Sequence, residues 1–170
     1  MTTVTETECP GCGFVLPGQP DAPNHPYIGA SAACWALYGE VLAREYEDPA
    51  YFRVHQLTVD TYAAQHPGVP ERRSIQSLAL HLITLCLVLE DAADPADGPE
   101  LHRRLAKQLE FSWLEPPERI GKITVADVRA ATDAAEHERI VRRWAREVWR
   151  AWEPHHATVR RWIDRSFGDC

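Results

Sequence analysis

The chain of 170 residues has the length of one ordinary domain, and its composition of 45% hydrophobic and 25% charged residues is typical of a globular protein rather than a disordered one. Its formal net charge of -7 argues against general nucleic-acid binding. The N-terminal stretch MTTVTETE lacks the basic and apolar regions of a signal peptide, and no apolar run reaches the roughly 18 residues that cross a bilayer. We therefore expect a cytoplasmic protein with no membrane partner.

Residues 1–30 are rich in proline and glycine, which predicts an irregular segment rather than a helix. This segment holds the motif CPGCG, in which two residues separate Cys9 from Cys12. In a reducing compartment such a pair is more typical of metal ligands or a redox couple than of a disulfide. We therefore treat residues 1–30 as a loop-rich, metal-binding cap.

From residue 31 onward, apolar residues recur at helical spacing almost everywhere, and strand signals are weak. Helices are expected over 31–47, 49–66 and 73–92, because prolines, glycines or N-cap residues mark their boundaries. Residues 31–92 are therefore predicted to form a three-helix core.

The C-terminal part, residues 100–167, is also helical by pattern, with a fourth helix expected over 100–111. Thr124 and Asp127 have the spacing of a capping box, which predicts a helix that starts near Val125. The helical pattern continues to about Trp152, either unbroken or with a break, and Pro154 begins a last segment. The whole chain is expected to be a single all-α domain, a bundle of five or six helices with an irregular zinc-knuckle segment at its N-terminus.

A tetrahedral zinc site needs four ligands, and the CPGCG motif supplies two of them. If the first two helices are antiparallel neighbours, the start of one lies beside the end of the other. Cys34 belongs to the first turn of the first helix and His66 to the last turn of the second, so both fall at the same end of the bundle. The sequence therefore predicts a structural Zn²⁺ site with the ligands Cys9, Cys12, Cys34 and His66.

Other interpretations of these residues remain open. The pair Cys9 and Cys12 also suits redox activity or a plain turn. His25 lies in the loop and is an alternative to His66 as the fourth ligand. His55 lies roughly 16 Å from His66 along a helix that rises ~1.5 Å per residue, so it cannot bind the same ion. Iron is the alternative to zinc at a thiolate-rich site.

The segments CPGCG, CWALYGEVLAREY and VHQLTVDTYAAQHPG resemble an uncharacterised bacterial family, a domain of unknown function marked by an N-terminal CPxCG knuckle and a VHxLTVxxYxxQHP segment. The resemblance covers nearly the whole chain, including RRSIQSLALHL and RRWAREVWRAWEPHH. It implies no activity, but it indicates that the cysteines and the region of His66 act together. The matching positions are Cys9, Cys12, Cys34, His55, Tyr62, Gln65, His66 and Pro67.

A second candidate site involves histidines in the middle of the second and third helices. If these helices are antiparallel, His55 and His81 meet inside the bundle, where helical proteins build metal or acid–base sites. A competing interpretation is that each imidazole satisfies a hydroxyl or carboxylate of the core. His55, His81 and Glu40 are the candidate catalytic residues of a metal-dependent enzyme. The other polar partners considered are Tyr38, Asp60, Ser77 and the pair His155 and His156.

Three functions follow from these patterns. The first is a zinc protein that binds a small molecule or a protein partner through its aromatic-rich C-terminal helices. The second is the enzyme, although the chain has no glycine-rich phosphate loop, nucleophile elbow or His-Glu-x-x-His motif. The third is a DNA- or RNA-binding regulator that uses the eight arginines between Arg139 and Arg165, which are more typical of the solvated side of an amphipathic helix.

Overall fold

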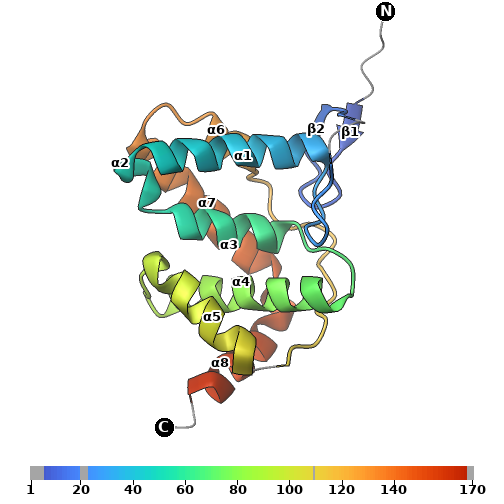
Figure 1. The fold of residues 1–170 in the computed structure, drawn as a ribbon, viewed down its shortest axis with the longest axis vertical. Coiled ribbons are helices and arrows are strands. Elements are labelled where there is room, and N and C mark those ends of the chain that lie inside the picture. Colours follow the sequence, from blue (N-terminus) through green and yellow to red (C-terminus); the bar gives the residue numbers. More distant parts are fainter. Residues whose placement is uncertain (1–5, 20–22, 109, 168–170) are drawn as a thin grey trace, which may run out of the picture.

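The fold was analysed in a computed structural model, which describes residues 6–19, 23–108 and 110–167. In Figure 1, α1, α3 and α4 are stacked one below another, α7 crosses behind them, and a small hairpin lies at one end of α1. The predicted all-α architecture is confirmed. The described residues form eight α-helices instead of five or six, because two of the expected helices are each broken in two.

Helix α1 (Ala32–Glu47) begins at Ser31, whose hydroxyl accepts a hydrogen bond from the backbone N–H of Cys34 at 3.2 Å, as expected for an N-cap. Its inner face carries buried side chains at helical spacing, and the last of them is a carboxylate. Asp48 ends α1 and at the same time caps α2 (Pro49–Phe52) by accepting from the N–H of Ala50. The buried residues of α1 are Ala33, Cys34, Tyr38, Val41 and Glu45.

The second expected helix, 49–66, is divided between α2 and α3 (His55–Gln65). Val54 has φ -109° and ψ 9°, outside the helical region, and its side chain is buried in the core. The break therefore lets Val54 pack inward, and it makes His55 the first residue of a new helix rather than a residue in the middle of a longer one. Sequence periodicity did not predict this break.

Helix α3 is the centre of the bundle, and most of its residues are buried, polar ones included. It runs antiparallel to α1, since the start of α1 meets the end of α3 at Cys34 and His66, and the end of α1 meets the start of α3 at Glu45 and His55. A helix that is buried on all sides must satisfy its own polar side chains inside the protein. Its polar residues therefore take part in hydrogen-bonded groups inside the bundle.

Helix α4 (Arg72–Glu90) packs against α3 and buries a stripe of leucines and isoleucine. By length and composition alone it is able to cross a membrane, a test that the core helix of a soluble protein also passes, and half of the tested stretch is buried here. A short 3₁₀ turn, η1 (Pro95–Asp97), leads into α5 (Gly98–Gln108), which packs on α4.

The helical region expected over 125–152 is divided in two, which is the alternative with a break. Helix α6 (Val125–Arg129) starts with the predicted capping box of Thr124 and Asp127, and Asp133 then caps a separate α7 (Ala134–Ala151). A 3₁₀ turn, η2 (Glu153–His155), joins α7 to α8 (His156–Phe167). The tryptophans of this region are buried in the core, so they present no aromatic surface to a ligand: Trp144, Trp149, Trp152 and Trp162.

The N-terminal segment contains two strands that the sequence did not predict. Strand β1 (Glu6–Glu8) pairs antiparallel with β2 (Val15–Pro17), and the CPGCG turn lies between them. The turn is closed by backbone hydrogen bonds from Cys9 N–H to Phe14 O and from Gly13 N–H to Cys9 O, both 2.9 Å long. Three residues per strand are too few for a periodic pattern, so the sequence does not indicate these strands.

Candidate metal centre

The structure brings together four side chains from three separate parts of the chain. Their donor atoms, three sulfurs and one imidazole nitrogen, all lie within 4.8 Å of one another. All are buried except Cys12, which is partly exposed. The sequence placed these residues at one end of the bundle, and there they meet: Cys9, Cys12, Cys34 and His66.

The knuckle reaches the bundle because its glycines allow a close approach. A Cβ atom on Gly11 would lie 2.4 Å from Cδ2 of His66, which leaves no room for a side chain. Gly13 has φ +71°, a conformation that other residues rarely adopt. The backbone N–H of Ser31, at the start of α1, points at the sulfur of Cys9 from 3.4 Å. The turn is therefore fixed against both helices.

His66 is oriented by the backbone of its own helix. Its Nδ1 lies 2.7 Å from the carbonyl oxygen of Tyr62, which can only accept, so Nδ1 carries the proton. The lone pair is then on Nε2, which faces the sulfur of Cys34 at 3.5 Å. A metal-binding histidine is held in this way in proteins, by a hydrogen bond from the nitrogen that does not bind the ion.

The distances inside the cluster fit a tetrahedral ion. The sulfurs of Cys12 and Cys34 are 3.9 Å apart, and the sulfur of Cys34 is 3.5 Å from Nε2 of His66. Zinc bonds of ~2.3 Å to sulfur and ~2.0 Å to nitrogen in a tetrahedron separate two sulfurs by about 3.8 Å and sulfur from nitrogen by about 3.5 Å. The four side chains are therefore close enough to share one metal ion of this size.

The electrostatics of the cluster also call for a cation. The hydrogen bonds with the Cys12 and Cys9 sulfurs, together with burial, raise the pKa of Cys34, because a thiolate there would lie beside other sulfurs away from water. The Tyr62 hydroxyl donates to the Cys34 sulfur at 3.4 Å and offsets only part of this cost. Three thiolates can therefore share this site only when a positive ion compensates them.

His25, the alternative fourth ligand, lies elsewhere. Its ring packs against the rings of Tyr27 and Trp35, and its Nδ1 accepts from the N–H of Tyr27. The donor cluster contains His66 instead.

His55 and His81 lie in separate hydrogen-bonded groups, contrary to the expectation that they meet. His55 Nδ1 lies 2.8 Å from Oε2 of Glu45, whereas His81 Nδ1 lies 2.7 Å from Oδ1 of Asp60. The break at Val54 explains the difference, because it starts α3 at His55 and turns that imidazole toward the end of α1. Asp60 was among the predicted partners, and Glu45 was not.

Glu45 is a fully buried carboxylate with donors on both oxygens. His55 donates to Oε2, while Thr58 and His137 donate to Oε1 at 2.6 and 2.7 Å. Nδ1 of His137 in turn accepts from the guanidinium of Arg44 at 2.8 Å. Burial alone would raise the pKa of Glu45, but these hydrogen bonds outweigh it and hold that pKa below its usual value. Both carboxylate oxygens are therefore paired, in a network that ties α1 to α3 and α7.

Asp60 belongs to a different group, formed with α4 and α5. Besides His81, it accepts from the side-chain amide of Gln56 at 3.0 Å, and Nε2 of His102 lies 3.5 Å from its Oδ1. Burial lowers the pKa of His102 to about 4, so that its imidazole is uncharged at neutral pH. The donor atoms of Asp60, His81 and His102 lie within 4.8 Å of one another.

The sequence did not identify His102 or His137, since neither belongs to a motif. His137 lies one helical turn before Val141 on the apolar stripe of α7, and that position was the available signal. Glu40, by contrast, is exposed on α1 and pairs with Arg129 at 2.7 Å, away from both histidine groups. Two arginines of α7 are likewise paired with glutamates of their own helix, Arg139 with Glu136 and Arg142 with Glu138.

Comparison with known proteins identifies a family. No curated protein and no solved structure matches the chain. Residues 7–153 match the model of a family of unknown function (DUF5946), a range that contains both groups of donor atoms described above. Since the match spans most of the sequence, the chain belongs to this family of unknown function, as its sequence predicted.

Proposed function

We propose that the protein binds one zinc ion in the Cys9, Cys12, Cys34 and His66 cluster, and that this ion is structural. The observation that carries the proposal is the close approach of three sulfurs and one correctly oriented imidazole nitrogen. This donor set is typical of structural zinc, because thiolate and imidazole ligands complete a tetrahedron and leave no position for a substrate. Thiol ligands also favour a reducing compartment, which supports a cytoplasmic location.

The role of the ion would be to hold the N-terminal hairpin against the bundle. The hairpin buries little apolar surface of its own, since β1 is exposed and the apolar side chains of Phe14 and Val15 are exposed as well. Segments that lack a core commonly depend on metal ligation for their folding energy. One ion that joins the knuckle to α1 and α3 would replace that missing core.

With a closed zinc shell, the physiological task would lie elsewhere on the surface, in binding a small molecule or a protein partner. Because the tryptophans of α7 and α8 are buried, this role would fall to other surfaces. A cavity of about 680 Å³ beside the knuckle is a suitable place, since it is lined by both charged and apolar groups. It lies between the CPGCG turn and the 118–124 segment.

Elemental analysis of protein purified without added metal tests the zinc proposal. We expect about one zinc per chain, lost in Cys34→Ser and His66→Ala but retained in His25→Ala, since the His25 ring packs away from the cluster. Iron in place of zinc would change the metal and leave the ligand set intact. A parent protein that is folded and carries no metal would refute the proposal.

A further inference from the structure

Asp60 is a buried carboxylate whose charge is poorly compensated. It lies in the middle of α3 with no exposed surface, and its contacts with His81 and Gln56 both fall on Oδ1. Its other oxygen, Oδ2, is buried and has no hydrogen-bond partner among the described residues. Burying an ionised carboxylate is costly unless it is paired or binds a metal. An unpaired Oδ2 therefore indicates that Asp60 has a partner besides the described residues.

Glu45 provides the internal comparison, because it is an equally buried carboxylate on a helix of the same bundle. Both of its oxygens accept hydrogen bonds, and a guanidinium stands behind one of its histidines. The groups that pair with Asp60 within 4.0 Å in the described part of the chain are the two imidazoles of His81 and His102. Asp60 therefore lacks the compensation that Glu45 has.

The three side chains come from three helices and converge on one point. Asp60 is on α3, His81 on α4 and His102 on α5, and their donor atoms lie within 4.8 Å of one another. Nε2 of His102 also lies 2.6 Å from the hydroxyl of Thr84. That hydroxyl donates its proton to the carbonyl oxygen of Leu80 at 3.1 Å, so its oxygen accepts from the N–H of His102, and a metal ion bound at this nitrogen would take the place of that proton.

We propose that Asp60, His81 and His102 form a second metal site, which binds a divalent first-row transition metal ion. Two imidazoles and one carboxylate are an established donor set for such ions, and they leave coordination positions open. The ion would compensate the charge of Asp60 and give its second oxygen a positive partner. The uncharged state of His102 at neutral pH suits this role, because a protonated imidazole cannot bind a metal.

The site has a route to solvent. The side chains of His81 and His102 are 15% and 18% exposed, and His81 lines a cavity of about 440 Å³ together with Tyr27, Arg73 and Ser77. An ion bound here would thus have water, or an oxygen ligand from the cavity, within reach of its open positions.

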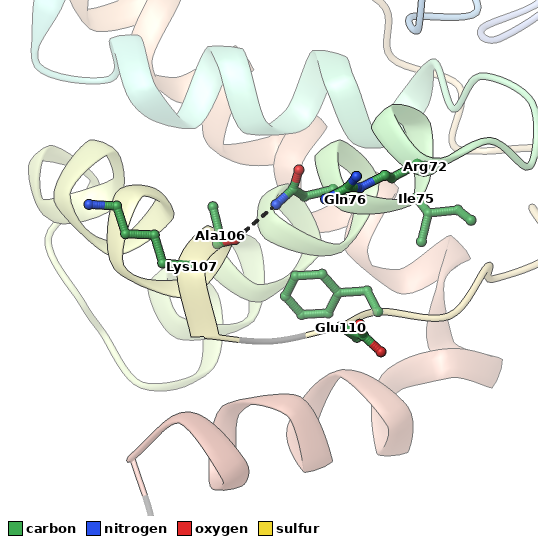
Figure 2. Close-up of a pocket in the computed structure, with 7 residues that line it drawn as sticks. Arg72, Ile75, Gln76, Ala106, Lys107 and Glu110 are labelled. Atoms are coloured by element: carbon green, nitrogen blue, oxygen red, sulfur yellow. Dashed lines mark hydrogen bonds between the residues drawn. The ribbon is translucent and has the colours of Figure 1, made fainter.

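A second cavity, of about 680 Å³, adjoins the first and shares Gln76 and Ala106 with it. Figure 2 shows Gln76 reaching across to α5, where its amide donates to the carbonyl oxygen of Ala106 at 3.1 Å. The two cavities therefore meet at Gln76 and Ala106, along the contact of α4 with α5.

Cobalt binding tests the proposal on the full chain. Protein purified with its native metal content is equilibrated with Co²⁺, dialysed and analysed for metal, and its absorption spectrum is recorded. We expect one equivalent of Co²⁺ per chain without the charge-transfer absorption of a cobalt–thiolate bond, since no sulfur belongs to this site. Asp60→Asn, His81→Ala and His102→Ala should each lower Co²⁺ affinity by at least ~10-fold.

His155→Ala is the matched control and should leave Co²⁺ binding unchanged, because this imidazole lies in η2 and contacts the carbonyl oxygen of Glu115 instead of the proposed site. Circular dichroism checks that each variant is folded; His102, on α5 and partly exposed, is the variant least able to disturb the core. The proposal is overturned if the parent binds no Co²⁺ outside the sulfur cluster, or if folded His102→Ala binds it as tightly as the parent does. The two sites share no residue, so failure of Co²⁺ binding at Asp60, His81 and His102 would not affect the test for zinc at the four-residue cluster.

Discussion

Gly11 lies directly against the imidazole of His66, so that a Cβ atom added to this glycine would be 2.4 Å from Cδ2 of the ring. The same Cβ would be 2.9 Å from the carbonyl oxygens of Gln65 and Gly29, which are backbone atoms and cannot move without shifting the chain. The knuckle therefore reaches its fourth ligand only because position 11 has no side chain.

We expect Gly11→Ala to weaken metal binding and to lower the free energy of unfolding by about 1–3 kcal/mol, the usual cost of overpacking. Competition with a chromogenic chelator measures the first effect, and urea unfolding measures the second. Gly39→Ala is the control, since a Cβ at this exposed position in α1 meets no atom within 4 Å. That variant should be stabilised by about 0.5–1 kcal/mol, and equal stability losses at both positions would contradict the argument.

Removing the metal should lower the melting temperature sharply. If the chain is held at a free zinc concentration about 1,000 times its Kd, zinc contributes about 4 kcal/mol, which corresponds to a fall in Tm of roughly 8–16 °C for a protein of this size. Calorimetry with and without a strong chelator gives this difference. Cys34→Ser should unfold near the temperature of the chelated parent and should no longer respond to the chelator. A chelated parent that melts unchanged would show that the metal is not structural.

Glu45 should make the stability depend on pH in the acid range. Its pKa is held below the ordinary value in the folded state, so its contribution is present above the pKa of the unfolded chain, near 4.5, and disappears as the pH falls through the lower folded value. The charged or titratable groups that face it are Arg44, His55 and His137.

Glu45→Gln should lose about 3–5 kcal/mol at pH 7, because it leaves buried donors without their carboxylate. Urea unfolding measures the free energy of unfolding of parent and variant at pH 7 and at pH 4. The difference between the two proteins should be smaller at pH 4. Glu40→Gln serves as the control, since that carboxylate is exposed and its pair with Arg129 is worth little. If this difference in unfolding free energy does not change with pH, Glu45 is not the ionised group described here.

Gln65 should prove essential for the position of the segment that follows α5. It is fully buried, and its amide donates to the carbonyl oxygens of Ile120 and Ile123 at 2.8 and 2.9 Å. Its own oxygen accepts from the indole N–H of Trp144 at 3.0 Å. Gln65→Leu leaves these groups without partners, at about 1–3 kcal/mol for each one.

We therefore expect Gln65→Leu to lower the free energy of unfolding by several times as much as an ordinary surface substitution does. We also expect residues 118–124 to become accessible to limited proteolysis in this variant. Gln76→Leu is the matched control, because its amide makes one hydrogen bond, to Ala106, in a partly exposed place. If both variants are equally stable and equally resistant to protease, the buried amide does not hold the segment.

Much of the sulfur cluster was predictable from the sequence because its parts are marked by local rules. Ser31 caps α1 and so places Cys34 in the first turn, while Pro67 ends the second helix after His66. Two short-connected antiparallel helices then bring those residues to the same end, and a flexible loop carries the knuckle to them. Each step depends on neighbouring residues only, which is why the same four donors appear in the structure.

The two carboxylate–histidine groups were not predictable in the same way. The break at Val54 depends on burying that side chain in the assembled core, and it decides that His55 turns to Glu45. His102 and His137 reach their carboxylates from helices far along the chain. Helical periodicity specifies which face of a helix is buried, but not which residue of another helix lies opposite.

The sequence by itself thus determined the helical class, the helix ends that caps and prolines mark, and the four donors of the sulfur cluster, since caps, prolines and apolar spacing act over a few residues. The tertiary structure alone decided that Glu45 is compensated on both oxygens while Asp60 is not. The physical reason is that the cost of a buried charge depends on the groups packed around it, and those come from other helices.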